Sequence, residues 1–170
     1  MTVTAATTTH DGTRYEFHQT DCIPWLLNRQ WQGGEFVYCD PPYLMHTRKG
    51  GRELYAYEYD DADHVALLST LRRLPCMVMI SGYWSELYAD TLADWRTITY
   101  TTGDRGGNLR TEWAWMNYPA PTTLHEYTYL GDDYRERERI KRKRRRWVRM
   151  LADMPPLERM AIIEELIGLA

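Results

Sequence analysis

Phe-Val-Tyr-Cys-Asp-Pro-Pro-Tyr, at residues 36–43, joins a short apolar run to an abrupt stop. Residues 36–39 are apolar or aromatic without alternation, which is typical of a buried strand. The strand must end at Asp40, because Pro41 and Pro42 cannot donate to a sheet ladder. We therefore expect a buried strand whose carboxyl end presents Asp40 beside Tyr43.

The rest of the pattern predicts an α/β domain over residues 15–125. A helix with leucines at helical spacing follows an acidic cluster, and a second apolar strand comes next. Another helix leads to two β-prone stretches that flank a glycine-rich turn, which indicates an antiparallel hairpin at the far edge of the sheet. These elements are expected at residues 36–39, 60–74, 76–80, 85–95 and 97–118.

The two ends of the sequence differ from this domain. Residues 1–14 are polar and rich in threonine, and we expect a flexible lead-in that carries no secretory signal. Residues 126–170 predict a helical tail, with helices at about 134–152 and 156–169. The longest uncharged apolar run, residues 75–80, is far shorter than the roughly 20 residues of a membrane span. The sequence thus predicts a cytoplasmic protein.

Composition excludes several classes of protein. The chain has 170 residues, of which 44% are hydrophobic and 26% charged, so it has too much apolar surface for a disordered chain. Its three cysteines, Cys22, Cys39 and Cys76, form no Cys-x-x-Cys pair. A disulfide framework and a zinc knuckle are therefore not expected, and we interpret the cysteines as reduced, mostly buried thiols.

The charge is concentrated in one segment. Residues 135–149 hold ten Lys or Arg and two Glu, although the whole chain has a net charge of −3. A solvated helix would intersperse both signs, so the segment predicts contact with double-stranded DNA, largely independent of base sequence. The cations expected to contact phosphate are Arg135, Arg139, Arg142, Lys143 and Arg146.

The Asp-Pro-Pro-Tyr turn suits the binding of a planar exocyclic amine. Ligands of open α/β sheets bind beyond the carboxyl ends of strands, where this turn is expected. The two prolines stiffen the backbone, so that Asp40 and the carbonyl of Pro41 become two fixed acceptors for the two hydrogens of an NH₂ group. Tyr43 can stack on the ring that carries the amine.

These residues resemble motif IV of the DNA adenine methylase (Dam-like) family. The resemblance covers roughly residues 15–119, and residues 129–147 resemble the end of some phage-type members. Its further residues are His46-Thr47-Arg48, Asp63-His64, Ile80-Ser81-Gly82-Tyr83, Leu87-Tyr88, Trp95, Arg110-Thr111-Glu112-Trp113, Trp115 and Asn117.

The resemblance implies transfer of a methyl group from S-adenosylmethionine to the N6 amine of an adenine flipped out of a DNA duplex, in a prokaryotic or phage setting such as restriction-modification. Asp40, Pro41, Pro42 and Tyr43 then form the catalytic motif. Asp21 matches the acidic position that contacts the adenosyl group of the cofactor. Three residues are expected next to the flipped base and the phosphates: His46, Thr47 and Arg48.

The sequence lacks the glycine-rich cofactor loop that such enzymes place after a strand. Gly33-Gly34, Gly50-Gly51 and Gly106-Gly107 do not stand between a strand and a helix. By the resemblance, the chain holds the second half of a Rossmann-like class I methyltransferase sheet. Its catalytic strand then has an open edge that invites pairing with another polypeptide or a second copy. Alternatively, the N-terminal residues cover that edge, or the reading frame is truncated.

Two functions follow from these patterns. The first is an S-adenosylmethionine-dependent adenine-specific DNA methyltransferase, which needs a partner if its cofactor site is incomplete. The second is an inactive, methyltransferase-derived module or subunit that binds DNA. On chemistry alone, cytosine N4 and the amide of a protein glutamine are also possible acceptors of the methyl group.

Overall fold

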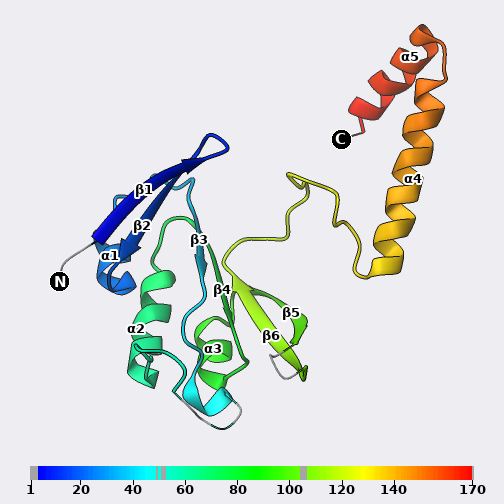
Figure 1. Cartoon of the computed structure of the whole chain (residues 1–170). Coiled ribbons are helices and arrows are strands. Elements are labelled where there is room, and N and C mark those ends of the chain that lie inside the picture. Colours follow the sequence, from blue (N-terminus) through cyan, green and yellow to red (C-terminus); the bar gives the residue numbers. More distant parts are fainter. Residues whose placement is uncertain (1–3, 49, 51–52, 104–106, 170) are drawn as a thin grey trace. The chain divides into compact units, whose positions relative to one another are not determined.

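A computed structural model describes residues 4–48, 50, 53–103 and 107–169 of the chain (Figure 1). The chain divides into two compact units, Met1–Ala120 and Pro121–Ala170. Residues 1–3 of the expected lead-in, and Gly51 and Gly106 of the expected glycine pairs, lie outside the described residues.

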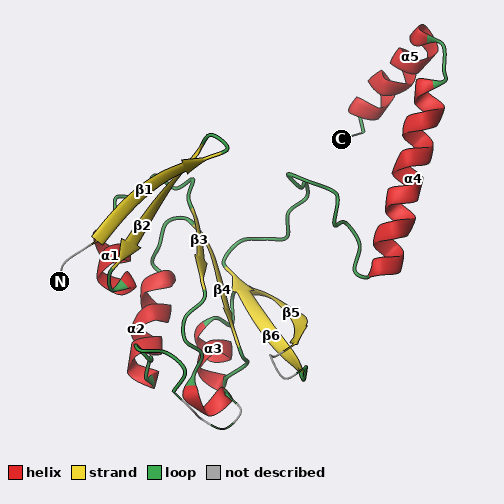
Figure 2. Ribbon diagram, viewed as in Figure 1, coloured by secondary structure: helices red, strands yellow, loops and turns green. Residues whose placement is uncertain are grey.

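A mixed sheet with strand order β3-β4-β6-β5 organises the first unit (Figure 2). β3 (Phe36–Cys39) and β4 (Met77–Gly82) run parallel. β6 (Leu109–Met116) pairs antiparallel with β4 and, on its other side, with β5 (Arg96–Gly103). The predicted α/β class and the hairpin at the far edge of the sheet are confirmed. β3 forms the opposite edge of this sheet.

Two helices accompany the parallel pair of strands. α2 (Asp61–Leu71) connects β3 to β4, and α3 (Glu86–Thr91) follows β4. Asp60 caps α2 by accepting a hydrogen bond from the backbone N–H of Asp63 at 2.8 Å, so the acidic cluster begins a helix as predicted. The leucines of α2 pack into the core that includes Leu67, Leu68, Leu71, Val78, Ile80 and Trp115.

An antiparallel hairpin replaces most of the expected lead-in. β1 (Thr4–His10) pairs with β2 (Thr13–Gln19) in a separate two-stranded sheet. Asp11 and Gly12 form its turn with φ angles of 48° and 82°. The expectation of a flexible segment was wrong for residues 4–14, because Asp-Gly between the threonine-rich β1 and the alternating polar and aromatic residues of β2 favours a two-residue hairpin turn.

The second unit contains the predicted helical tail. α4 (Tyr134–Ala152) has the predicted bounds, with Asp133 as its N-cap. α5 (Pro156–Ile167) starts at the predicted proline and ends two residues earlier than predicted. No helix among the described residues is long and apolar enough to cross a membrane.

Candidate active site

Asp40 lies where the two parallel strands end. It directly follows β3, and Cys39 of β3 stands opposite Ile80 of β4. The next residue of β4, the buried Ser81, donates its hydroxyl to Oδ1 of Asp40 at 2.8 Å. The Tyr38 hydroxyl lies 3.0 Å from Ser81 Oγ, in position to donate to it. This chain of hydroxyls orients the exposed Asp40 carboxylate.

Asp40 keeps acceptor capacity for a ligand. Within the described part of the chain, no hydrogen bond reaches its Oδ2 or the carbonyl oxygen of Pro41. Pro41 itself is buried, which fixes the backbone between Asp40 and the half-buried Tyr43. Two unused acceptors thus stand beside an aromatic ring, as the chemistry of an exocyclic amine requires.

Tyr43 is held by its ring and by its hydroxyl. Its ring packs edge-on against Tyr83, with 4.8 Å between centroids and 72° between planes. Its hydroxyl donates to Oε2 of Glu112 at 3.0 Å. Burial, and then the charge of Asp40, raise the pKa of Tyr43 well above its ordinary value, so the phenol stays neutral at physiological pH.

Glu112 ties the hairpin to this turn. It also accepts hydrogen bonds from Tyr100 Oη at 3.2 Å and Thr102 Oγ1 at 2.6 Å. Burial and the charge of Glu112 raise the pKa of Tyr100 to about 12. The sequence alone assigns Glu112 no role of its own, because its contacts depend on the β5–β6 register, which places Tyr100 opposite it.

A cavity of about 470 Å³ adjoins Tyr83. Among the residues around it are His46 and Thr47, from the short 3₁₀ helix η1 (Met45–Thr47), and Arg110 from β6. Trp84 adds a half-exposed indole to this wall. The cavity therefore combines aromatic, cationic and hydroxyl groups with the carboxylate of Glu86, and it adjoins the motif through Tyr83, whose ring contacts Tyr43.

Arg48, expected next to the flipped base and the phosphates, forms an ion pair within the chain. Its guanidinium donates to both carboxylate oxygens of Glu58, at 2.8 and 2.7 Å, and only 6% of its side chain is exposed. These hydrogen bonds lower the pKa of Glu58 to about 2. Arg48 thus forms an ion pair within the loop after η1, and its contact with a phosphate stays a prediction.

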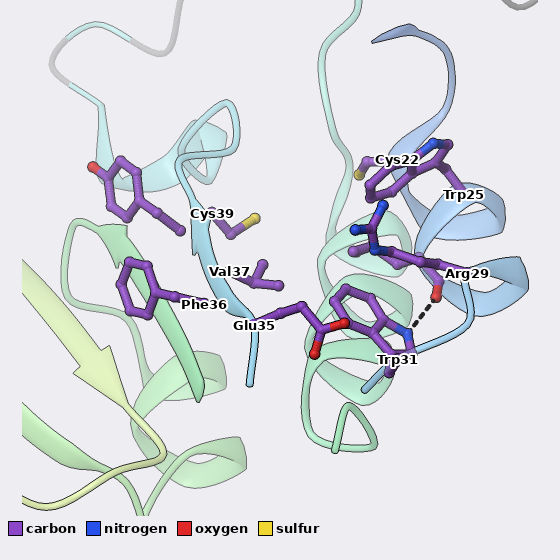
Figure 3. A pocket seen from close by; sticks show the side chains of 10 residues that line it. Cys22, Trp25, Arg29, Trp31, Glu35, Phe36, Val37 and Cys39 are labelled. Carbon is purple, nitrogen blue, oxygen red and sulfur yellow. Dashed lines mark hydrogen bonds between the residues drawn. The ribbon is translucent and has the colours of Figure 1, made fainter. Parts of the chain in front are cut away.

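A groove of about 560 Å³ separates α1 (Cys22–Asn28) from the edge strand β3 (Figure 3). Trp25 of α1 lies on one side, and Val37 and Cys39 of β3 point toward it from the other. Burial raises the pKa of the Cys39 thiol to about 12, so this thiol is neutral. The groove is largely apolar, with Arg29 and Glu35 as its charged residues.

These residues fit only part of S-adenosylmethionine. The groove offers an apolar slot for a purine ring. Asp21 is the N-cap of α1, which lines this groove, and its carboxylate accepts a hydrogen bond from the Ile23 N–H at 3.0 Å. The charged methionine end needs a cradle of main-chain donors, and no glycine-rich loop follows a strand to open a helix among the described residues. The sulfonium end has no site built from these residues.

The predicted phosphate contacts of the tail lie in the second unit. They stand on α4 and are exposed to solvent: Arg135, Arg139, Arg142, Lys143 and Arg146.

No family model, no curated protein and no solved structure matches this chain.

Proposed function

We propose that the first unit binds the N6 amine of a flipped adenine in DNA and presents it for methylation by S-adenosylmethionine. The observation that carries this proposal is the pair of unused acceptors, Asp40 Oδ2 and the Pro41 carbonyl, beside the Tyr43 ring at the end of β3. On this proposal, the sheet is the second half of a Rossmann-like class I methyltransferase fold.

The acceptors act on the nucleophile. Two hydrogen bonds from the amine to Asp40 and Pro41 leave the nitrogen lone pair pointing away from the turn, toward an electrophile. As the new N–C bond forms, the nitrogen becomes positively charged, and the Asp40 carboxylate stabilises that charge. The proton that the nitrogen then loses is already hydrogen-bonded to an exposed carboxylate, which passes it to water. When bound, S-adenosylmethionine would supply the methyl group from its cationic sulfur. The sulfur would keep the electron pair of the broken C–S bond.

The cavity beside Tyr83 receives the flipped nucleotide. Flipping costs a few kcal/mol, which stacking and hydrogen bonding must offset. Trp84 provides a stacking surface, while His46, Thr47 and Arg110 provide donors for the sugar and its phosphates.

A second polypeptide completes the cofactor site in this proposal. β3 is an edge strand, so the backbone groups on one of its sides have no strand partner in the described sheet. The groove beside it is apolar and open to an incoming strand. A strand that pairs there, from a different protein, would bring the glycine-rich loop that this chain lacks to the methionine end of the cofactor.

The cradle is tested by comparing adenosine with N6,N6-dimethyladenosine, which lacks both N–H donors, in an NMR titration. We expect adenosine to bind at least about tenfold more tightly, since a hydrogen bond to a charged acceptor is worth about 1.5–3 kcal/mol. In Asp40→Ala this preference falls to less than about threefold, because the carboxylate is gone and the added methyl groups have room. Asp90→Ala, an equal charge change at an exposed residue of α3, retains it.

Methylation itself is tested with tritiated S-adenosylmethionine and an adenine-rich duplex. The expected product is N6-methyladenine identified by mass spectrometry, absent in Asp40→Ala. Equal binding of the two nucleosides by the unaltered chain would contradict the cradle. If the chain prefers adenosine over N6,N6-dimethyladenosine but transfers no methyl group, even when whole-cell extract supplies partners, the second candidate is favoured, an inactive DNA-binding module. The missing glycine loop is the observation behind that alternative.

A further inference from the structure

Five of the eight arginines of α4 lie in a single line along the helix. Arg135, Arg139, Arg142, Arg146 and Arg149 follow one another at intervals of four, three, four and three residues. Residues at these intervals share one face of a helix. With a rise of 1.5 Å per residue, the line extends over about 21 Å. We call these five residues the arginine stripe.

The stripe faces away from the apolar side of the same helix. At 100° per residue, Ile140, Trp147 and Leu151 form a narrow seam roughly 140° around the helix from the middle of the stripe. Ile140 and Leu151 are partly buried, whereas all five arginines of the stripe are exposed. The stripe and the apolar seam therefore lie on roughly opposite sides of α4, and the remaining Lys and Arg residues stand at other angles around the helix.

Little within the second unit neutralises the stripe. Arg139 forms an ion pair with Glu136 at 3.1 Å, and Arg142 donates to the backbone carbonyl of Glu138 at 3.2 Å. The Glu138 carboxylate instead pairs with Lys141, which lies off the stripe. Among the described residues, no carboxylate pairs with Arg135, Arg146 or Arg149. The exposed pair at Arg139 is worth little, so its arginine can exchange partners.

We propose that the arginine stripe binds the sugar-phosphate backbone of duplex DNA, as a contact separate from the site at Asp40. A duplex carries one negative charge per about 1.7 Å of its axis, so the stripe's length spans about twelve of them. Guanidinium groups pair with phosphate through two parallel hydrogen bonds, and every member of the stripe is an arginine. The contact reads no bases, because phosphates carry no sequence information.

The position of the apolar seam favours DNA over a membrane surface. An interfacial helix needs a wide apolar face that enters the lipid with cations on its flanks. In α4 the seam is narrow and the stripe points away from it, so the two cannot meet one lipid surface together. This inference depends only on α4 and does not require methyl transfer.

The test measures binding of the full chain to a short fluorescein-labelled DNA duplex by anisotropy, at several salt concentrations and without cofactor. Five phosphate contacts predict a slope of about −4.5 for log affinity against log salt concentration. The double variant Arg142→Gln/Arg146→Gln should reduce that slope by about 2 and weaken binding more than about tenfold at 0.1 M salt.

A matched variant separates the stripe from general positive charge. Lys141→Gln/Arg144→Gln removes the same charge from the side of α4 where Arg144 bonds to the Tyr127 carbonyl. It should change the affinity less than about threefold. Circular dichroism checks that both variants keep their helices.

Three results would overturn the proposal. Equal losses of duplex affinity in the two double variants would show that general positive charge, and not the stripe, binds the DNA. A salt-dependence slope near zero would exclude phosphate contacts. Binding to phosphatidylserine vesicles or to polyglutamate that exceeds duplex binding at equal charge concentration would identify a different partner. The duplex titration contains no cofactor, so a negative result in it would leave the adenosine comparison unaffected. A negative result in the adenosine comparison would likewise leave duplex binding by the stripe unaffected.

Discussion

Ser81 connects the two parallel strands at the proposed site. Because its hydroxyl donates to Asp40 Oδ1, the Tyr38 hydroxyl is the donor in the contact with Ser81. The carboxylate is therefore fixed through one oxygen and leaves the other for a ligand. A group used for catalysis has to be held in this way, since orientation supplies much of the rate advantage.

At the scale of residues, part of the site follows from the sequence. Two prolines after an apolar strand place Asp40 and Tyr43 at the end of the sheet, because proline stops the ladder. Glu58 as the partner of Arg48 does not follow, since the loop between them has no periodic pattern. The same holds for Glu112, whose three hydroxyl donors come from two other segments.

His64 provides a prediction on pH. It is fully buried in α2, with Nδ1 2.9 Å from the Tyr88 hydroxyl and no partner for Nε2 in the described structure. Burial lowers its pKa below the ordinary 6.5. Below about pH 6.5 the unfolded chain binds a proton that the folded chain rejects, so stability falls as the pH falls. From about pH 7.5 to 5.5, we expect His64 to lower the free energy of unfolding by at most about 1.4 kcal/mol, the limit for a histidine that stays neutral in the folded chain.

Urea unfolding of the parent chain and of His64→Gln at both pH values measures this contribution. The parent's loss should exceed that of the variant by up to the stated amount, because glutamine does not titrate. His125→Gln, which removes an exposed imidazole, should behave as the parent does. A variant with the full pH dependence of the parent would assign the titration to other groups.

At the scale of elements, the edge strand β3 is only partly covered. Phe36 and Tyr38 on one of its faces are about half exposed, and Val37 and Cys39 on the other face line the groove. A four-residue strand with one partner contributes few ladder hydrogen bonds. This makes β3 a place where an added strand would gain both hydrogen bonds and apolar burial.

Elements with a strong periodic signal were predictable. α2, α4 and the β5–β6 hairpin follow from leucine spacing, a long charged run and β-prone stretches about a glycine turn. The β1–β2 hairpin was not predicted, because polar threonines without alternation resemble a loop, although Asp11-Gly12 is a turn signal. The order β3-β4-β6-β5 depends on long-range pairing that local patterns do not encode.

The cap of α2 gives a prediction at this scale. Asp60 and Asp63 form a reciprocal capping box, with each carboxylate accepting the other residue's backbone N–H, at 2.8 and 3.0 Å. Asp60→Ala should lower the free energy of unfolding by about 1 kcal/mol, because an N–H of the first turn loses its acceptor. Urea unfolding measures the change.

Asp61→Ala is the matched control, since Asp61 adds negative charge to the same first turn without capping it. Its cost should be smaller and should disappear in about 1 M salt, which screens the helix dipole. The cost at Asp60 should remain in that salt, because it comes from a hydrogen bond. If salt removed both effects, the capping box would contribute only its charge.

At the scale of the whole molecule, the buried core belongs to one unit. Its side chains lie between Leu26 and Trp115, and neither α4 nor α5 has a buried residue. Leu157 of α5 is 87% exposed. The hydrophobic stabilisation of the chain is thus concentrated before Ala120, where the first unit ends.

This distribution predicts the effect of ending the chain at Ala120. The shortened chain should unfold in urea with a free energy within about 1 kcal/mol of the corresponding transition in the full chain, since no buried side chain is lost. Near-UV circular dichroism follows this unit selectively, because six of the seven tryptophans precede Ala120. The shortened chain should also keep its preference for adenosine over N6,N6-dimethyladenosine.

Duplex binding should respond in the opposite way, because the arginine stripe is removed with the second unit. The salt-dependent affinity should fall by more than about a hundredfold, as expected for the loss of five phosphate contacts. The control is the full chain with Arg142→Gln/Arg146→Gln, which should lie between the two. A shortened chain that binds duplex as tightly as the full chain would place the main DNA contacts at His46, Thr47 and Arg110, and α4 would then need another partner for its charge.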